Sequence, residues 1–291
     1  MRRPWVRLLG WAAIVLSLAL IGRILWTSAG QLRDLDWRVF VGPGVLGLGL
    51  YGVSLGLQAA VWTGLVSTLS LSVWSWRDVE VYFSTHLTRR LPGLPWYMGG
   101  RMIAYEKGSL RSRAALSASL IEWGGMLMAA GVWALVGYLQ GVRLALALAG
   151  LVALVLAASR ILSNWPRARK WVQLDQLRAG PLLLAAASYG VAWLLGGLIL
   201  HLLVTARIPS AGLLAVTSAW AVSGVASMVM VFMPAGLGVR ELTLTLVLGP
   251  QLGDALALVV ALLIRILFAL GDLIWGGAFW LLARSRSSHT P

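Results

Sequence analysis

Long apolar runs are the feature of this sequence that most limits its fold. Each has about 20 residues, the length that an α-helix needs to cross the hydrocarbon core of a bilayer. Only 12% of the 291 residues are charged, whereas soluble domains carry about 25%. The sequence therefore predicts an all-α, polytopic integral membrane bundle of about seven or eight spans in one transmembrane domain, 1–291. The predicted spans are 8–26, 43–66, 114–139, 142–162, 181–204, 210–233 and 255–283.

One apolar region is interrupted in a way that an ordinary span does not tolerate. Residues 233–241 read Met-Pro-Ala-Gly-Leu-Gly-Val-Arg-Glu. Pro234 removes a backbone donor, and Gly236 and Gly238 permit backbone angles that other residues avoid. In hydrocarbon, broken backbone persists only where protein or a water-filled cavity satisfies its polar groups. We therefore predict a discontinuous or re-entrant segment over residues 234–250, at or near a site.

A second broken segment, 79–104, precedes the third predicted span. It is charged and aromatic, and it is interrupted at Pro92 and Gly93. The two halves, 79–91 and 96–104, are each shorter than the ~20 residues of a span. We predict two short helices that form a re-entrant or interfacial pair.

Basic residues indicate the orientation of the chain. The formal net charge is +14, and Lys and Arg are concentrated in residues 77–113 and 164–178. Cytoplasmic loops carry such an excess, so both segments and the N-terminus are expected in the cytoplasm. A re-entrant 234–250 segment would leave the C-terminus outside. Arg284 and Arg286 instead favour a cytoplasmic C-terminus, which requires the short segment to complete a crossing.

Six ionisable residues in or beside the predicted spans are candidate substrate-binding residues. Charges inside a membrane usually face the bundle interior and pair with one another. The arginines could hold an anionic group such as a lipid phosphate through bidentate hydrogen bonds, and the amides of a half-helix that starts at Gly238 would assist. The structural alternative is that they extend to the interface or form buried ion pairs. The six residues are Arg101, Glu122, Arg240, Glu241, Arg265 and Asp272.

Opposite charges among these six residues allow several ion pairs, between which the sequence does not choose. Asp272 follows Arg265 by two helical turns, so the two share one helix face. The alternatives are Glu241 or Glu122 for Arg265, and Arg101 or Arg240 for Asp272.

Metal, cofactor and nucleic-acid chemistry have no support in the sequence. There are no cysteines, and the three histidines, His86, His201 and His289, lie too far apart for metal-ligand spacing. No nucleophile, base and orienting group form a recognisable motif, so we expect no catalytic residues, no metal and no cofactor. No soluble basic domain remains to bind nucleic acid.

The stretch Pro-Ala-Gly-Leu-Gly-Val-Arg-Glu at 234–241 resembles a family signature. The pattern Pro-Gly-Gly-Leu-Gly-Val-Arg-Glu is typical of the lysylphosphatidylglycerol synthase transmembrane region family, and Ala235 is a mild departure from it. Members of this family are prokaryotic integral membrane proteins that occur alone or fused to soluble enzymes. The resemblance implies a multi-pass protein of a prokaryotic cell membrane.

An earlier element of that family, Leu-x-Pro-Gly-x-x-Gly-Glu-x-x-Arg, is similar to Leu-Pro-Gly at 91–93 followed by Arg101. The family then has a Glu-Arg pair in the next span, where this chain has Glu122. The departures are Gly99 and Gly100 for the family's Gly-Glu, and Trp123 for its second arginine.

The resemblance implies lipid handling. The membrane part of the best-known relatives is similar to a flippase that moves aminoacylated phosphatidylglycerol between leaflets, whereas a soluble domain after the spans performs aminoacyl transfer. Because this chain ends at Pro291, we expect no synthase activity. We expect translocation of a lipid with an anionic or lipid-linked headgroup, held by the candidate arginines. The candidate acids would orient them or meet a cationic headgroup.

The alternative function is a non-catalytic membrane subunit. Some relatives accompany glycosyltransferases that act on lipid-linked sugars, so the chain could position such a glycosyltransferase or another lipid-modifying enzyme through basic loops 77–113 and 164–178. A membrane-embedded transferase is a minor further alternative. The sequence leaves a homo-oligomer open.

Overall fold

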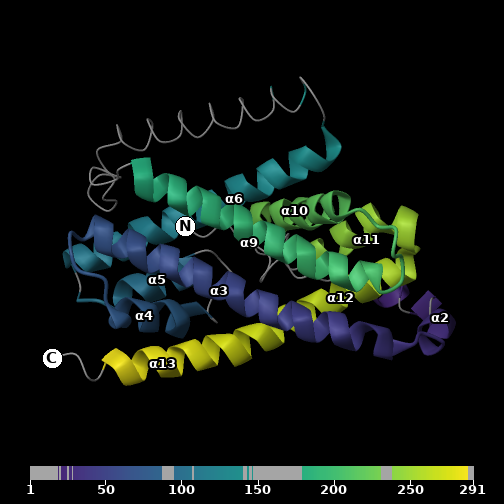
Figure 1. Cartoon of the computed structure of the whole chain (residues 1–291), viewed down its shortest axis with the longest axis horizontal. Helices are drawn as coiled ribbons and strands as arrows, with labels where there is room; N and C mark the ends of the chain where they lie inside the picture. Colours follow the sequence, from purple (N-terminus) through teal and green to yellow (C-terminus); the bar gives the residue numbers. More distant parts are fainter. Residues whose placement is uncertain are drawn as a thin grey trace.

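A computed structural model shows a bundle in which long helices run side by side (Figure 1). In the part of the chain that it describes, regular structure is entirely helical, which confirms the all-α prediction there. The described residues are 19–86 except 20, 25 and 28, 95–139 except 107, 143, 146, 179–230 and 238–287.

Four helices are long and apolar enough to cross a membrane. They agree with the predicted spans 43–66, 114–139, 181–204 and 255–283. The predicted spans 8–26 and 142–162 lie largely outside the described residues. The four are α3 (Val41–Leu69), α6 (Leu110–Tyr138), α9 (Ala179–Thr205) and one continuous helix made of α12 (Asp254–Gly271), the π-helical turn η4 (Asp272–Gly276) and α13 (Gly277–Ser287).

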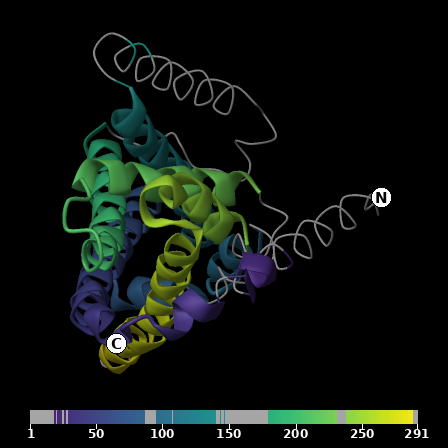
Figure 2. The same cartoon turned by 90° about the vertical axis from the view of Figure 1, so that its right-hand side faces the viewer.

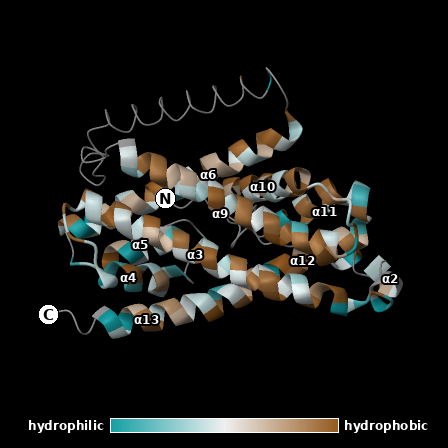
Figure 3. Ribbon diagram, in the orientation of Figure 1, coloured by the Kyte–Doolittle hydropathy of each residue, from teal (hydrophilic) through white to brown (hydrophobic). Residues whose placement is uncertain are grey.

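Apolar side chains cover much of the outside of these helices. Val45, Leu183 and Ile266, for example, are exposed. Hydrophilic residues gather toward the two ends of the bundle (Figure 3). This distribution suits a bundle whose middle is surrounded by lipid rather than water.

Two short helices precede α3, and both lie at one end of the bundle. They are α2 (Ala29–Arg33) and the 3-10 helix η1 (Trp37–Phe40). The end where α3 finishes is called the basic end, because Arg111 bonds Val73 just after α3 and Arg286 contacts Trp76, beside Arg77, at the start of α4. The end where α3 begins is called the opposite end.

The first pair of half-helices enters the bundle from the basic end. It consists of α4 (Trp76–His86) and α5 (Pro95–Ile103). Trp76 lies 4.9 Å from the guanidinium of Arg286 near the end of α13, whereas His86 reaches Asp272 at the centre of the long helix. The helix α4 therefore runs inward to about mid-bundle.

The chain returns to the basic end along α5. Tyr105, just after α5, donates a hydrogen bond to Asp78 in the first turn of α4 (2.7 Å). The two half-helices thus form a hairpin whose outer ends lie together at the basic end. Pro92 and Gly93, the predicted break, fall between α4 and α5 in the sequence and lie outside the described residues.

The second pair of half-helices, α10 (Leu213–Val229) and α11 (Val239–Leu252), enters from the opposite end. Ser218 near the start of α10 donates to the carbonyl of Trp133 near the end of α6 (2.8 Å). At the inner end, the Cα of Gly224 packs so closely on Trp193, in the middle of α9, that a Cβ would clash. The helix α11 then runs back to the turn before α12 (Figures 1 and 2).

The structure corrects the predicted span 210–233. The helix α10 has 17 residues and is too short to be one of the four candidate spans. It ends at Val229 because Met230 leaves helical geometry, a few residues before Pro234, which cannot continue a helix. Since α11 turns back, the C-terminal end of α13 reaches the basic end without the short crossing that the sequence required.

The two hairpins belong to halves of opposite direction. The order long helix, hairpin, long helix occurs first in α3 to α6 and again in α9 to α13. The helices α3 and α9 pack against each other in antiparallel orientation, with Gly47 near the start of α3 against Ile199 near the end of α9. Each hairpin packs its first arm on the last helix of the other half, α4 on α13 and α10 on α6.

Candidate functional site

The inner ends of the two hairpins are separated by a chain of buried polar and aromatic side chains. It contains three clusters of charged residues, all in the middle of the bundle and contributed by α3, α4, α5, α6, α11, α12 and η4.

The first cluster surrounds Arg101 on α5. Its guanidinium forms an ion pair with Glu122 on α6, and both side chains are fully buried (0% exposed). It also donates to Ser119 Oγ (3.2 Å) and Thr85 Oγ1 (3.3 Å). Aromatic faces enclose it, and cation–π attraction adds to the ion pair. The rings are those of Trp62, Tyr82 and Tyr97, at 4.7, 4.3 and 5.1 Å.

The second cluster fixes the start of α11. Gly238 has φ +82°, a conformation that suits glycine, and its amide donates to Glu241 Oε2 (2.8 Å). The other oxygen of Glu241 accepts from Arg265 on α12. Glu241 is buried, while the Arg265 side chain is 25% exposed. One carboxylate therefore caps α11 and ties it to the next helix.

Arg240, beside this ion pair, contacts aromatic rings but donates no hydrogen bond to any described residue. Its guanidinium lies 3.5 Å from the Trp220 ring centroid and 5.9 Å from that of Trp193. Among the described residues it donates no hydrogen bond, although its Nε is buried. A guanidinium has five N–H donors. Arg240 thus offers donors that no described residue accepts, at the N-terminus of a half-helix, where the helix dipole also favours an anion.

The third cluster joins three helices around Asp272, the first residue of the π-helical turn. Tyr51 Oη on α3 donates to Asp272 Oδ1, and Nε2 of His86, the last residue of α4, lies 3.0 Å from the same oxygen. Asp272 is 4% exposed and His86 5%. The inner end of the first hairpin is therefore attached to the long helix through a buried carboxylate.

Aromatic contacts connect the clusters. The Tyr51 ring stacks on Phe268 (4.4 Å), and Phe268 meets the edge of Trp220 (5.2 Å), on which Arg240 lies. In the other direction, Tyr82 is 5.8 Å from His86 and its hydroxyl donates to Glu122 (3.1 Å).

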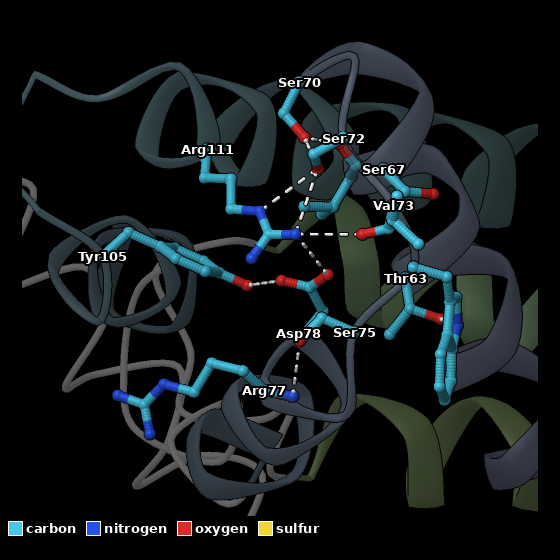
Figure 4. A network of polar contacts seen from close by, with 12 residues as sticks. Thr63, Ser67, Ser70, Ser72, Val73, Ser75, Arg77, Asp78, Tyr105 and Arg111 are labelled. Atoms are coloured by element: carbon cyan, nitrogen blue, oxygen red, sulfur yellow. Dashed lines mark hydrogen bonds and ion pairs between the residues drawn. The ribbon is translucent and has the colours of Figure 1, made fainter. Parts of the chain in front are cut away.

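A separate network closes the base of the first hairpin (Figure 4). Arg111 at the start of α6 donates to Ser72 Oγ and to the carbonyl of Val73, and its Nη2 lies 4.0 Å from Asp78. Burial raises the pKa of Asp78, against the opposing effects of the Tyr105 hydrogen bond and the Arg111 charge. Burial also raises the pKa of Tyr105, which therefore stays a donor.

The structure decides between the expected ion pairs. Arg265 pairs with Glu241, one of its two predicted partners. Arg101, one of the two alternative partners predicted for Asp272, pairs with Glu122 instead, because α5 returns along α6. Asp272 is bonded by Tyr51 and His86. Of the predicted break residues, Gly238 is described, whereas Pro234 and Gly236 lie outside the described residues.

Sequence reasoning missed the neutral partners of these charges. His86 was considered only as a metal ligand. Its position at the end of a short helix, just before the Pro-Gly break, is the signal that could have placed it at a hairpin tip. Nothing in the sequence distinguishes Tyr51 or Trp220 from other aromatic residues of the apolar runs.

The fold and the buried charges define an α-helical membrane protein, with at least the four apolar helices long enough to cross a bilayer. No protein-family model matches the chain, and no curated protein sequence matches it significantly.

Proposed function

We propose that the protein moves the headgroup of a membrane lipid between leaflets, through the polar centre between the two hairpins. The observation that carries the proposal is Arg240, a cation at the start of a mid-bundle half-helix that donates no hydrogen bond to any described residue. Guanidinium donors that bond no described residue, together with a helix N-terminus, suit a phosphate oxygen.

In this proposal the basic end is cytoplasmic. Segments 77–113 and 164–178, rich in Lys and Arg, both connect to helices at that end, and cytoplasmic loops carry such an excess. Segments 8–26 and 142–162 supply two further spans. The bundle then has six full crossings and two re-entrant hairpins from opposite sides, with both termini in the cytoplasm of a prokaryotic cell.

Half-helices that meet near the membrane midplane, in halves of inverted direction, are typical of secondary transporters. The two halves support alternating access, in which one hairpin opens toward each side and the Gly- and Pro-rich breaks act as hinges. The apolar exterior leaves the acyl chains in the bilayer while the headgroup passes inside. The resemblance of residues 234–241 to the lysylphosphatidylglycerol synthase transmembrane region family supports the same function.

Headgroup movement in proteoliposomes tests this proposal. Fluorescent phosphatidylglycerol, phosphatidylethanolamine and a polyprenyl-linked sugar are each reconstituted with the wild type, and accessibility of the outer-leaflet probe to a quencher is followed. We expect flip of at least one lipid and a loss of about tenfold or more in Arg240→Gln, because a charge-assisted hydrogen bond contributes about 1.5–3 kcal/mol. Absence of flip for all three lipids would contradict the proposal.

The matched control is Arg207→Gln. Arg207 is an exposed arginine after α9, at the same end from which the second hairpin enters. The Arg207→Gln substitution removes one positive charge, as Arg240→Gln does, but from the surface. A nonspecific effect of charge on reconstitution would therefore appear in both variants. We expect Arg207→Gln to flip lipid at the wild-type rate.

A second candidate function, positioning a lipid-modifying enzyme, is favoured by the surface of the basic end. Trp74, Arg77 and Arg113 are all exposed, and aromatic residues and arginine are enriched in protein interfaces. Co-purification of one membrane enzyme, lost on combined Arg77→Ala and Arg113→Ala substitution, would support this function.

A further inference from the structure

One nitrogen of Arg111, at the base of the first hairpin, faces three acceptors (Figure 4). Its Nη2 donates to Ser72 Oγ (3.1 Å) and to the carbonyl of Val73 (3.0 Å). The same atom lies 4.0 Å from Asp78 Oδ2, which is beyond hydrogen-bond distance. A terminal guanidinium nitrogen carries two N–H groups, and both are used in the loop between α3 and α4. A direct bond to Asp78 therefore requires Nη2 to give up one of the other two acceptors.

The carboxyl group of Asp78 is buried with one of its oxygens unbonded. The residue is 0% exposed, Oδ1 accepts from Tyr105 (2.7 Å), and Oδ2 has no hydrogen-bond partner among the described residues. Burial of an ionised carboxylate that lacks donors costs far more than burial of a neutral carboxyl group. The arrangement therefore suits protonated Asp78, and the burial that raises its pKa acts in the same direction. Ionised Asp78 instead needs Arg111 as a donor.

The loop that Arg111 holds has a strained backbone. Leu71 has φ +52°, a left-handed conformation that residues other than glycine seldom adopt. Its side chain is exposed, so packing against the bundle does not explain the conformation. Ser70 Oγ is bonded to the carbonyl of Val66 and to Ser72 Oγ. Nε of Arg111 adds a further bond to Ser72 (3.2 Å). A strained loop that is held in part by an arginine has a relaxed alternative when the arginine leaves it.

We propose that Asp78 and Arg111 form a proton-operated latch at the basic end. While Asp78 holds a proton, Arg111 stays on Ser72 and Val73 and fixes the loop between α3 and α4. Loss of that proton draws the guanidinium onto Asp78 Oδ2, and the loop is released. The O–H bond of the carboxyl group is the only covalent bond that breaks, and water accepts the proton.

Other groups close to Asp78 do not replace this guanidinium as a donor to Oδ2. Arg77 precedes it on α4, and its side chain bonds Glu80 instead (2.9 Å). The hydroxyl of Tyr105 donates to the other oxygen, and the backbone N–H of Ser75 also favours the ionised form. Among the described residues, the start of α6 therefore supplies the donor.

The helices packed on α4 direct their charges elsewhere. Within its described length α3 has no charged residue. On α5, Arg101 belongs to a buried ion pair, and on α13, Arg286 lies over a tryptophan ring. Asp272 of η4 contacts the other end of α4. After α5, Glu106 is exposed, and the side chain of Lys107 lies outside the described residues.

The position of the latch indicates what it controls, and this part of the inference rests on the proposed lipid translocation. Asp78 lies in the first turn of α4, whose other end reaches the centre of the bundle. With Arg111 on the loop, α6 is tied to the end of α3. With Arg111 on Asp78, α6 is tied to α4, and the first hairpin moves relative to α3 and opens at the basic end. A rise in pH at that end, which the proposed topology places in the cytoplasm, therefore promotes headgroup movement.

Distances between spin labels test the latch without a transport assay. Because the chain has no cysteine, Val73→Cys and Leu110→Cys introduce two labels without background. Both side chains are exposed, and the backbone carbonyl that Arg111 binds is kept. In lipid nanodiscs we expect one narrow distance at low pH and a longer, broader distribution at high pH. The midpoint of this transition should lie above 3.8, the ordinary pKa of the Asp78 side chain.

Two variants make the expected result specific to Asp78. Asp78→Asn keeps an acceptor for Tyr105 but cannot ionise, so it should show the narrow distance at every pH. Glu106→Gln removes an exposed acid just after α5 and should behave as the wild type does. A wild-type distance that does not change with pH, or a change that persists in Asp78→Asn, would overturn the latch.

Tyr105→Phe serves if Asp78→Asn does not fold. The hydrogen bond from Tyr105 favours ionised Asp78, so its loss should move the transition in label distance to higher pH. A transition that stays at the wild-type pH would equally contradict the latch.

Regulation of lipid movement is tested by flip rates in proteoliposomes that have the same pH on both sides. We expect the wild-type rate to rise several-fold as the pH passes through the transition in label distance, and the rate of Asp78→Asn to stay low at every pH. A wild-type rate that ignores this transition would overturn the regulation and leave the latch and the lipid function standing. A label distance that responds to pH in a protein that flips no lipid would instead overturn the lipid function and leave the latch.

Discussion

The two hairpins use the same device with opposite charges. In each, the returning half-helix is tied to the next long helix by one ion pair, Arg101 with Glu122 in the first and Glu241 with Arg265 in the second. The charge order along the chain is reversed, as is the direction from which the hairpin enters.

The hairpins differ in the partners of their buried arginines. Arg101 is fully buried among three aromatic rings and bonds Glu122, Ser119 and Thr85, although its Nη2 has no hydrogen-bond partner among the described residues. Asp78 and Tyr105 bond the base of its hairpin. Arg265 is partly exposed, and Arg240 donates no hydrogen bond to any residue in the described part of the chain. The comparison teaches that the cation of the first hairpin has an ion-pair partner, while Arg240 in the second has donors that no described residue accepts, as the proposed headgroup site requires.

Glu122→Gln should have the largest effect on folding. It leaves the guanidinium of Arg101 buried without its counter-charge, and breaking such a buried pair costs about 3–5 kcal/mol. The free energy of unfolding in mixed micelles, followed by tryptophan fluorescence, measures this loss. Arg113→Leu, an exposed arginine on the same helix, is the control. A loss below that of the control would show that the pair contributes nothing to the first hairpin.

Arg240→Gln should reduce lipid binding more than it reduces stability. No hydrogen bond within the described protein is lost, and loss of the cation–π contact with Trp220 costs about 0.5–2 kcal/mol, whereas a ligand phosphate loses interactions that contribute about 1.5–3 kcal/mol. Thermal stabilisation by added phosphatidylglycerol measures the effect, with Arg207→Gln as control. Equal stabilisation of both variants by lipid would remove the distinction between the hairpins.

Glu241→Gln makes the same substitution in the second hairpin as Glu122→Gln makes in the first. We expect a smaller loss of unfolding free energy, about 1–2 kcal/mol. The partly exposed guanidinium of Arg265 keeps access to the surroundings of the protein, and the side-chain amide oxygen of the new glutamine still accepts the hydrogen bond from Gly238. Unfolding titrations of the two variants, run side by side, test the order. A cost equal to that of Glu122→Gln would mean that both hairpins are equally closed.

Asp78→Asn should remove a small pH dependence from the base of the first hairpin. Burial raises the pKa of Asp78 above its ordinary value of 3.8, so the folded protein keeps this proton where the unfolded chain has lost it. The stability it contributes is present at low pH and falls as the pH rises through the raised pKa. Relative to wild type, the variant should therefore become more stable as the pH rises from acid to neutral. A difference in unfolding free energy between Asp78→Asn and wild type that is the same at all pH values would contradict the raised pKa of Asp78.

Helix positions could be predicted from the sequence because a span is a local property. The length of the apolar run fixed the expected limits of α3, α6 and α9 to within a few residues. The span 210–233 failed for a local reason as well: hydropathy does not register that the backbone after Val229 leaves helical geometry, so an inward half-helix and a full crossing give the same apolar pattern.

The partners of the charges could not be predicted, because they depend on the path of the chain between helices. Glu122 and Asp272 are both buried acids with an arginine in plausible reach. Only the return of α5 along α6 gives Arg101 to Glu122 and leaves Asp272 to His86. Hydrogen bonds from Tyr51 and cation–π contacts from Trp220 add to this difficulty, because aromatic residues in apolar runs look the same whether they face lipid or a charge.

The π-helical turn at Asp272–Gly276 determines how the long helix would respond to the deletion of a single residue. A turn of this kind holds one residue more than an α turn, so it absorbs that residue while the helical segments on either side keep their relative phase. Deletion of a single residue inside the turn, such as Gly276, would therefore restore uniform α winding and leave Phe279 close to Phe83 of α4, on which it stacks. Deletion of Gly277, the first residue of the regular helix α13, while the turn persists, would instead rotate everything after it by about 100° about the axis. The place of a one-codon deletion, with almost no change in hydropathy, would thus decide whether the two halves of the molecule stay aligned.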